Sequence, residues 1–327
     1  MSEVNEMPVA NRAADAGNML KGLRDMPESR LILAILIGSL ALAWQSEAFL
    51  SAVNIRSVLL GFSFIAIAAL GQLVVVITGR IDLSTGSTMA LSGMVTALAL
   101  VAGAPVPLGV CIGIAVGGAV GAVNAFFSVG FGVNAFIVTL GSLQVARGIT
   151  IGLTEGDTVT GFSDLFLDLG SRTVYGLPIP VWIALALLTV FTVVLRYTGF
   201  GRELYAIGGN ETAARLAGVN IRRHQSIVFI LSGMMAGLAG VLLTARLGAA
   251  VSNAAFGYEL VVIASVVIGG ASLSGGAGTA LGVILGALLI GLVNNALVLL
   301  VVPTYWQQTF IGAVIVAAAL IDRMRRL

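Results

Sequence analysis

The chain has 327 residues, of which 58% are hydrophobic and 10% are charged, and its formal net charge is +2. These few charged residues cannot cover the apolar surface of such a chain in water. The composition therefore excludes a water-soluble globular protein and indicates a lipid bilayer as the environment of the chain. The single cysteine, Cys111, excludes an internal disulfide and argues against a cysteine metal site.

Apolar stretches long enough to cross a membrane recur along the sequence. The hydrocarbon core is about 30 Å thick and requires roughly 20 apolar residues per helix. About ten stretches qualify, so we expect an all-α, polytopic membrane protein of about ten transmembrane helices. The eighth stretch is short and is a candidate for a bent or re-entrant helix. The predicted spans are 31–50, 57–78, 87–103, 107–128, 134–153, 178–196, 226–245, 259–270, 279–302 and 307–321.

A polar segment, 79–87, interrupts the apolar pattern between the second and third predicted spans. Its glycines allow the chain to leave helical geometry, and Asp82, Ser84 and Ser87 supply carboxylate and hydroxyl groups. A charge near the bilayer centre costs roughly 2.5 to 3.5 kcal/mol, so a deeply placed Asp82 should face protein, water or a polar cargo. Two interpretations stay open. Asp82 pairs with Arg80 or a helix end at the cytoplasmic border, or it takes part in a permeation path or its gate.

Polar side chains inside the predicted spans are few, and the fifth span carries the most. An interhelical hydrogen bond, worth about 0.6 kcal/mol in a membrane, explains each of them singly. The alternative is that some border a permeation path, with the fifth span beside an aqueous passage. The candidate path residues are Gln72, Asp82, Ser84, Ser87, Asn124, Asn134, Asn294 and Asn295.

A longer polar segment, 196–225, separates the sixth and seventh predicted spans and contains one predicted short helix. Asn210 can cap this helix, Glu211 favours the positive end of its dipole, and Arg215 follows four residues later. Gly218 can end it. Because so short a helix is marginal in water, it needs a docking surface, and we expect a soluble partner to bind it.

The pattern G-x-x-x-L-S-x-G occurs twice, at 79–86 and at 269–276. Two similar interruptions in the two halves of the chain suggest an internal repeat, and such interrupted segments mark transport sites in membrane folds built from repeats. Glycine and serine are also common where membrane helices pack closely, so coincidence combined with packing stays the alternative.

The distribution of basic residues predicts that both termini are cytoplasmic. Arg56, Arg172 and Arg246 then lie outside, Arg147 falls within a span, and the outer loop 154–177 is expected to form a lip or a short surface helix. The same bias explains the net charge of +2 without a nucleic-acid partner. Of the 17 Lys and Arg residues, 13 are inside: Arg12, Lys21, Arg24, Arg30, Arg80, Arg196, Arg202, Arg215, Arg222, Arg223, Arg323, Arg325 and Arg326.

The sequence contains no recognisable catalytic constellation. No phosphate loop of the type G-x-x-x-x-G-K-S/T is present, so the chain has no visible means of hydrolysing ATP. The single histidine, His224, follows Arg222 and Arg223 and is interpreted as part of a solvated basic edge. No metal-ligand spacing and no nucleophile with an activating histidine are found. We therefore expect no catalytic residue, no metal and no cofactor.

Five separated segments resemble, in the same order, those of the permease subunit of ribose-type (monosaccharide) ABC importers. The resemblance covers most of the chain from the second span onward. It implies a helical subunit of the bacterial plasma (inner) membrane with a second permease copy or paralogue as its neighbour. It also implies a soluble extracellular or periplasmic sugar-binding protein and a cytoplasmic ATP-binding subunit as partners. The segments are 77–87, 136–141, 208–218, 257–276 and 306–326.

The resemblance assigns the segment 196–225 to the cytoplasmic loop that docks in the ATPase. The residues expected to couple to the ATPase are Asn210, Glu211, Ala213, Ala214, Arg215 and Gly218. Three positions depart from the family's pattern. Arg80 stands where glycine is common, Thr85 where a small apolar residue is common, and Asn134 close to a common proline, which leaves the exact sugar open.

We therefore expect a permease domain, 31–327, preceded by a cytoplasmic segment, 1–30, that moves a monosaccharide or a related small polar solute by alternating access. ATP binding in the partner would displace the helix at Glu211 and change the side to which a cavity near Asp82, Asn124 and Asn294 opens. The alternative is an ion-coupled secondary transporter in which Asp82 binds a proton or a cation. Membrane lipid is an expected neighbour, and nucleic acid is not.

Overall fold

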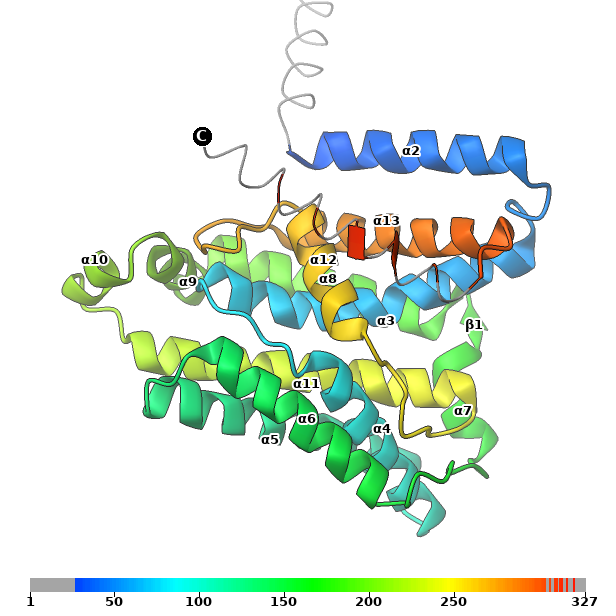
Figure 1. Ribbon diagram of the computed structural model, residues 1–327, viewed down its shortest axis with the longest axis horizontal. Helices are drawn as coiled ribbons and strands as arrows, with labels where there is room; N and C mark the ends of the chain where they lie inside the picture. The colour runs from blue at the N-terminus through cyan, green and yellow to red at the C-terminus, as the bar shows by residue number, and fades with distance from the viewer. Residues whose placement is uncertain are drawn as a thin grey trace, which may run out of the picture.

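The computed structural model describes residues 27–303 and single positions between Trp306 and Leu320. Within these residues the chain is all-α apart from one short hairpin (Figure 1). The amino-terminal segment to residue 26, most of the predicted tenth span, and six basic residues used to predict orientation lie outside the described residues. These six are Arg12, Lys21, Arg24, Arg323, Arg325 and Arg326.

A helix occupies each of the first nine predicted spans. In the described part of the chain, seven helices are long and apolar enough to cross a membrane, whereas α4 and α12 are shorter. The short eighth span is therefore confirmed as a short helix. The nine helices are α2 (Pro27–Gln45), α3 (Ala52–Ile77), α4 (Thr85–Val101), α5 (Val106–Ala125), α6 (Ala135–Gly152), α8 (Ile179–Tyr197), α11 (Ile221–Leu247), α12 (Tyr258–Ile268) and α13 (Ala280–Leu299).

Short elements connect these helices. The loop 154–177 contains α7 (Asp164–Ser171), which confirms the predicted surface helix, followed by a hairpin of β1 (Thr173–Val174) and β2 (Leu177–Pro178). The strands are antiparallel, with Thr173 opposite Pro178 and Val174 opposite Leu177. The remaining short elements are η1 (Phe126–Gly130), a π-helical turn that extends α5, and the consecutive helices α9 (Gly199–Gly209) and α10 (Glu211–Leu216).

Local sequence determines where several helices begin. Side-chain oxygens of residues that precede the helices accept hydrogen bonds from backbone amides of the first turn, which would otherwise have no partner. Proline stands in the first turn of α5 and of α8, where its missing amide hydrogen is tolerated. The capping residues are Ser51 for α3, Asn134 for α6, Thr198 for α9, Asn210 for α10, Asn220 for α11 and Thr279 for α13.

The helices α3 and α11 form the centre of the bundle (Figure 1). Small residues allow their neighbours to approach closely, as they do in other membrane proteins. Gly117 of α5 lies directly against Gly237 of α11, where an added Cβ on Gly117 would come within 2.9 Å of the Gly237 Cα. The outer helices are far less buried, and α10 projects from one end of the bundle beside α9 (Figure 1).

Candidate functional site

The segment 78–84 joins α3 to α4 without helical structure. The hydroxyl of Thr78 donates to the Val75 carbonyl at 2.7 Å and closes α3. Gly79 then has a φ of 75°, a left-handed conformation that glycine adopts without steric cost. The chain continues to Ser84, the N-cap residue of α4. The interruption of helical structure predicted here is confirmed.

Asp82 lies at the centre of a buried hydrogen-bond cluster. Its Oδ1 accepts from the backbone amide of Ser84 at 2.9 Å and from the Ser84 hydroxyl at 2.6 Å. Its Oδ2 accepts from the hydroxyl of Ser232 in α11 at 3.1 Å. Only 2% of Asp82 is exposed. These donors explain how the carboxylate is accommodated, because a buried polar group without partners is costly.

Two amide side chains extend this cluster to α3 and α5. Asn124 Nδ2 donates to the Ser84 hydroxyl at 2.9 Å and lies 3.5 Å from Asp82 Oδ1. The amide of Gln72 faces the backbone of Asp82. When this amide is assigned the orientation that satisfies both groups, its nitrogen lies 3.2 Å from the Asp82 carbonyl oxygen and its oxygen 3.1 Å from the Asp82 nitrogen. The Asp82 cluster, defined as Gln72, Asp82, Ser84, Asn124 and Ser232, therefore joins α3, α4, α5 and α11.

The contacts of Asp82 decide between the two partners, Arg80 and a helix end, that the sequence leaves open. Asp82 contacts the first turn of α4, which is a helix end, whereas Arg80 turns to a different element and donates to the Ser128 hydroxyl at 2.8 Å. Asn124 Oδ1 accepts no hydrogen bond from any residue that the structure describes. Asn124 Oδ1 is therefore a free acceptor in the cluster, and it can accept a hydrogen bond from a polar solute or from water.

The sequence does not single out Ser232. It lies 150 residues after Asp82 in an apolar helix, where a single serine is common. No spacing rule relates two residues so far apart, so only the packing of α11 against the segment 78–84 reveals the contact.

A cavity of about 400 Å³ opens between the segment 78–84, the start of α6 and α10. Asn134 caps α6 by accepting a hydrogen bond of 2.9 Å from the Phe136 amide, and it also borders this cavity. Arg80 and Glu211 line the cavity as well, and their opposite charges attract each other. We call it the Arg80 cavity. It brings a residue of the predicted path, Asn134, next to a residue of the predicted coupling helix, Glu211.

The remaining candidate path residues lie elsewhere. The hydroxyl of Ser87 donates to the Ser84 carbonyl at 2.9 Å inside α4, next to the Asp82 cluster. The side chains of Asn295 and Asn54 exchange hydrogen bonds of 2.6 and 3.1 Å between α13 and α3.

The asparagine pair lies far from the Asp82 cluster. Asn54 and Gln72 are separated by 18 residues of α3, or about 27 Å at 1.5 Å per residue. Asn294, which precedes Asn295 in α13, lies in the same distant region. The single cavity expected near Asp82, Asn124 and Asn294 is therefore corrected, because the Asp82 cluster meets α3 at Gln72, whereas Asn294 lies beside the opposite end of α3.

The predicted short helix is α10, and each of its local features is present. Asn210 Oδ1 accepts from the Ala213 amide at 3.0 Å, and Arg215 Nη2 donates to Glu211 Oε1 at 2.9 Å. Gly218 follows the helix with a φ of 88°. The predicted cap, ion pair and terminating glycine are therefore confirmed.

The side chains of α10 divide into a buried anchor and an exposed surface. Ala214 packs against Ile207 of α9 and Ile221 of α11. Ala213 is exposed, and Leu216 has 85% of its surface exposed. An exposed leucine is available to bury apolar area against another protein. No local pattern in the sequence singles out Leu216.

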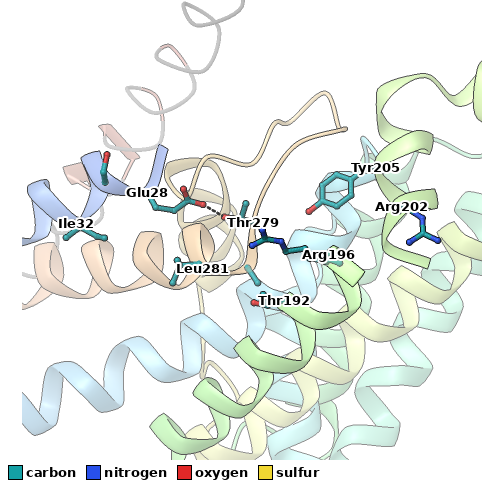
Figure 2. Close-up of a pocket in the computed structure, with 11 residues that line it drawn as sticks. Glu28, Ile32, Thr192, Arg196, Arg202, Tyr205, Thr279 and Leu281 are labelled. Atoms are coloured by element: carbon teal, nitrogen blue, oxygen red, sulfur yellow. Dashed lines mark hydrogen bonds between the residues drawn. The ribbon is translucent and has the colours of Figure 1, made fainter. Parts of the chain in front are cut away.

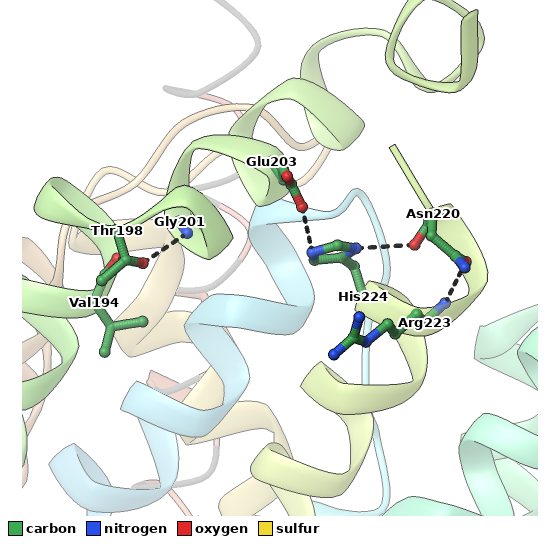
Figure 3. A network of polar contacts seen from close by, with 7 residues as sticks. All are labelled: Val194, Thr198, Gly201, Glu203, Asn220, Arg223 and His224. Carbon is green, nitrogen blue, oxygen red and sulfur yellow. Dashed lines mark hydrogen bonds and ion pairs between the residues drawn. The ribbon is translucent and has the colours of Figure 1, made fainter. Parts of the chain in front are cut away.

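His224 corrects a prediction from the sequence. Its Nε2 lies 2.6 Å from Glu203 Oε2 and its Nδ1 lies 2.9 Å from the Asn220 carbonyl oxygen (Figure 3). The ring stacks on Phe200 at 5.3 Å and is only 8% exposed. The interpretation as a solvated edge is wrong because the sequence did not predict α9, which supplies both Glu203 and Phe200. His224 instead joins α9 to the start of α11.

A larger cavity, of about 760 Å³, lies where the first turn of α2 meets α8, α9 and α13 (Figure 2). The hydroxyl of Thr279 donates to Glu28 Oε1 at 2.7 Å beside it. Apolar walls come from Ile32, Leu195 and Leu281. Recognition of a sugar requires several convergent polar groups, so this cavity is a poorer candidate for cargo than the more polar Arg80 cavity.

The chain matches the family described as branched-chain amino acid transport system / permease component over residues 54–319. The D-allose transport system permease protein AlsC of Escherichia coli is 40% identical over 297 residues, which cover 90% of each chain. The ribose import permease protein RbsC of Haemophilus influenzae is 38% identical over 303 residues, or 91% of this chain and 94% of that protein.

A third relative, the L-arabinose ABC transporter permease protein AraH of Azospirillum brasilense, is 37% identical over 298 residues. The match covers 91% of this chain and 88% of that protein. No solved structure matches the chain.

Proposed function

The chain belongs to the family of ABC importer permeases, and we propose that it carries a monosaccharide or a related small polar solute across the bacterial inner membrane by alternating access. The relatives named for allose, ribose and arabinose support a monosaccharide as the class of cargo. As a multi-pass permease subunit, the chain is not itself an enzyme.

The ATP-binding subunit docks on α10 in this proposal. The observation that supports this docking most is the structure of α10. The helix is capped and is anchored through Ala214, yet it presents Glu211, Ala213 and Leu216 outward. A six-residue helix is too short to be stable alone and gains from a surface on each side. Asn210, Arg215 and Gly218 hold its geometry, and the acidic and apolar groups make the contact.

The end of the bundle that carries α10 faces the cytoplasm. Basic residues gather there at the end of α8, in α9 and α10 and at the start of α11, which agrees with the positive-inside tendency. The ten spans predicted from the sequence place both termini on the same side. The segment 1–30 is then a cytoplasmic extension and 31–327 the transmembrane permease domain. The basic residues are Arg196, Arg202, Arg215, Arg222 and Arg223.

The extracellular or periplasmic sugar-binding protein docks at the opposite end. That end carries α7 and the hairpin of β1 and β2, within a loop that includes the acidic residues Glu155, Asp157, Asp164 and Asp168. A structured polar lip at the mouth of a permease gives a soluble receptor a surface to bind.

A second permease copy or a paralogue packs against α6. This helix exposes Gln144 together with Gly141 and Gly148, and an added Cβ on either glycine would meet no neighbouring atom. Close approach of a second helix requires small residues, and a polar side chain that faces lipid is unfavourable. The cargo would pass beside this surface, with lipid around the remaining outer helices.

The path for cargo includes the Arg80 cavity, where Arg80 and Asn134 supply hydrogen-bonding groups. The Asp82 cluster holds the helices that surround the path, and its free acceptor on Asn124 is available to a solute when the bundle opens. Gln72, Ser84 and Ser87 support the same region, whereas Asn294 and Asn295 stabilise the far ends of α3 and α13. The two G-x-x-x-L-S-x-G segments represent an internal repeat, since one follows the end of α3, the other follows the end of α12, and each interrupts helical structure.

Purification in mild detergent with reconstitution tests this function. We expect a nucleotide-binding protein to co-purify with the chain. We also expect vesicles that contain both proteins and the binding protein to accumulate a monosaccharide only when ATP is present on the α10 side. Uptake that persists without an ATPase and collapses with an uncoupler would instead indicate ion-coupled transport.

A further inference from the structure

The two G-x-x-x-L-S-x-G segments lie against each other although about 190 residues separate them. The amide of Gly276 donates a hydrogen bond of 2.9 Å to the carbonyl of Ile77, the last residue of α3. A Cβ on Gly275 would lie 2.8 Å from the Gly79 nitrogen, and one on Gly79 would lie 3.3 Å from the Ser274 carbonyl oxygen. Two glycines of the pattern, Gly79 and Gly276, together with the adjacent Gly275 therefore allow one backbone to pass directly over the other.

A third backbone closes this contact. Gly208, in the last turn of α9, lies so near to the Ile77 carbonyl and the Gly276 amide that a Cβ on Gly208 would overlap both. A Cβ on Gly275 would also lie 2.9 Å from the Gly208 Cα. We define the glycine junction as Gly79, Gly208, Gly275 and Gly276. At this junction three chain segments meet through backbone atoms.

The helix α9 holds the second segment at another point and continues directly into α10. The hydroxyl of Tyr205 donates to the Gly278 carbonyl at 2.7 Å. Asn210 follows, and its amide donates to the Ala206 carbonyl at 3.0 Å while its side chain caps α10. Because Asn210 belongs to the end of one helix and the start of the next, no flexible linker separates α10 from the glycine junction.

Each segment that meets at the junction leads into the bundle. The segment 78–84 runs from Gly79 to Asp82 and its cluster. The segment 269–279 connects α12 to α13. Gly86 lies against Glu259 at the opposite end of α12 so closely that a Cβ on Gly86 would overlap the Glu259 carboxylate. Displacement of α9 would therefore reach the start of α4 along one segment and α12 along the other.

We propose that the glycine junction transmits the displacement of α10 to segments 78–84 and 269–279 together, as one rigid unit. This inference rests on the proposed docking of the ATPase on α10. Contacts between side chains can yield by rotamer changes, but contacts between packed backbones have no such freedom and transmit strain. The repeated pattern thus has a mechanical role, with Gly208 as a positioning residue that acts through the two segments.

Two adjacent glycines provide a matched pair of variants. Gly208→Ala places a methyl group into the junction, whereas Gly209→Ala meets no atom within 4 Å. In the reconstituted complex with the ATPase and the binding protein, we expect Gly208→Ala to retain ATPase co-purification and basal ATP hydrolysis. It should lose uptake and receptor-stimulated hydrolysis by about tenfold or more, a usual range for coupling between sites. Gly209→Ala should behave like the unmodified protein.

A milder variant covers the case in which Gly208→Ala fails to insert. Tyr205→Phe removes only the hydroxyl that holds Gly278 and should reduce stimulated hydrolysis without a change in basal hydrolysis. Normal coupling in Gly208→Ala, or in Tyr205→Phe if Gly208→Ala cannot be purified, would overturn the proposal. If no ATPase binds the unmodified chain, the proposed function itself fails.

Spin-label distances give a readout that a purely structural role would not affect. In a Cys111→Ser background, labels at the exposed positions Thr212→Cys and Ala277→Cys should give one narrow distance that is equal with and without ATP. Labels at Thr212→Cys and Val53→Cys, at the far end of α3, should change their separation on ATP binding. A change in the Thr212–Ala277 distance would show that α10 and the segment 269–279 move independently, and the rigid unit would be refuted.

Discussion

The hydroxyl of Ser232 donates a hydrogen bond of 3.1 Å to the carboxylate of Asp82 and thereby joins the middle of α11 to the start of α4. Both residues are buried, and Asp82 receives its other donors from its own segment and from Asn124. Asp82 therefore links α11 to the first turn of α4. Its surroundings explain why a charged residue is tolerated within an apolar bundle.

Removal of this contact is expected to destabilise the protein. Ser232→Ala should lower the free energy of unfolding by about 1 kcal/mol, because the Asp82 carboxylate loses a buried donor. Thermal unfolding in detergent measures the effect. Ser226→Ala, at a half-buried position of the same helix, is the control and should leave the midpoint unchanged. Equal midpoints for both variants would show that the Ser232 contact contributes nothing to stability.

Changes in α10 should separate coupling from insertion. Glu211→Gln removes the charge that attracts Arg80 and pairs with Arg215, and we expect uptake to fall by about tenfold while membrane insertion is retained. Gly218→Ala should act in the same direction, because its φ of 88° strains an alanine. Glu47→Gln, at an exposed position between α2 and α3 outside both proposed docking surfaces, is the control. Unimpaired uptake in Glu211→Gln would count against the docking surface.

Asn134 offers a test that distinguishes helix capping from contact with cargo. Asn134→Ala should lower stability by about 1 kcal/mol because the Phe136 amide loses its acceptor. Asn134→Ser keeps an acceptor at this position, so we expect normal unfolding but an altered preference among monosaccharides in uptake assays. If Asn134→Ser leaves the preference unchanged, this part of the Arg80 cavity does not select cargo.

The pair of Asn54 and Asn295 is expected to act on stability alone. A double-mutant cycle with Asn54→Ala and Asn295→Ala should give a coupling energy of about 1 kcal/mol in unfolding, because each side chain donates to the other. The affinity for cargo in uptake assays should be unchanged in all three variants. A selective loss of affinity in Asn295→Ala would place this residue in the path after all.

Features encoded within a few residues could be predicted. The cap by Asn210, the ion pair of Glu211 with Arg215 and the turn at Gly218 each involve residues within one or two helical turns. The nine helices that occupy predicted spans also follow from local composition, since a helix in lipid must satisfy its own backbone and present apolar side chains. The helix α9 was missed because the polar segment around it has no apolar period long enough to predict it.

The sequence by itself determined the environment of this protein, its helical class, the places of its described spans and the geometry of α10, because hydropathy and capping depend on neighbouring residues. Only the tertiary structure decided that Ser232 reaches Asp82, that Glu203 and Phe200 enclose His224, and that Gly208 meets Ile77 and Gly276. These contacts depend on how whole helices pack against one another. No local pattern records that packing, so residues far apart in the sequence reveal their partners only in the folded bundle.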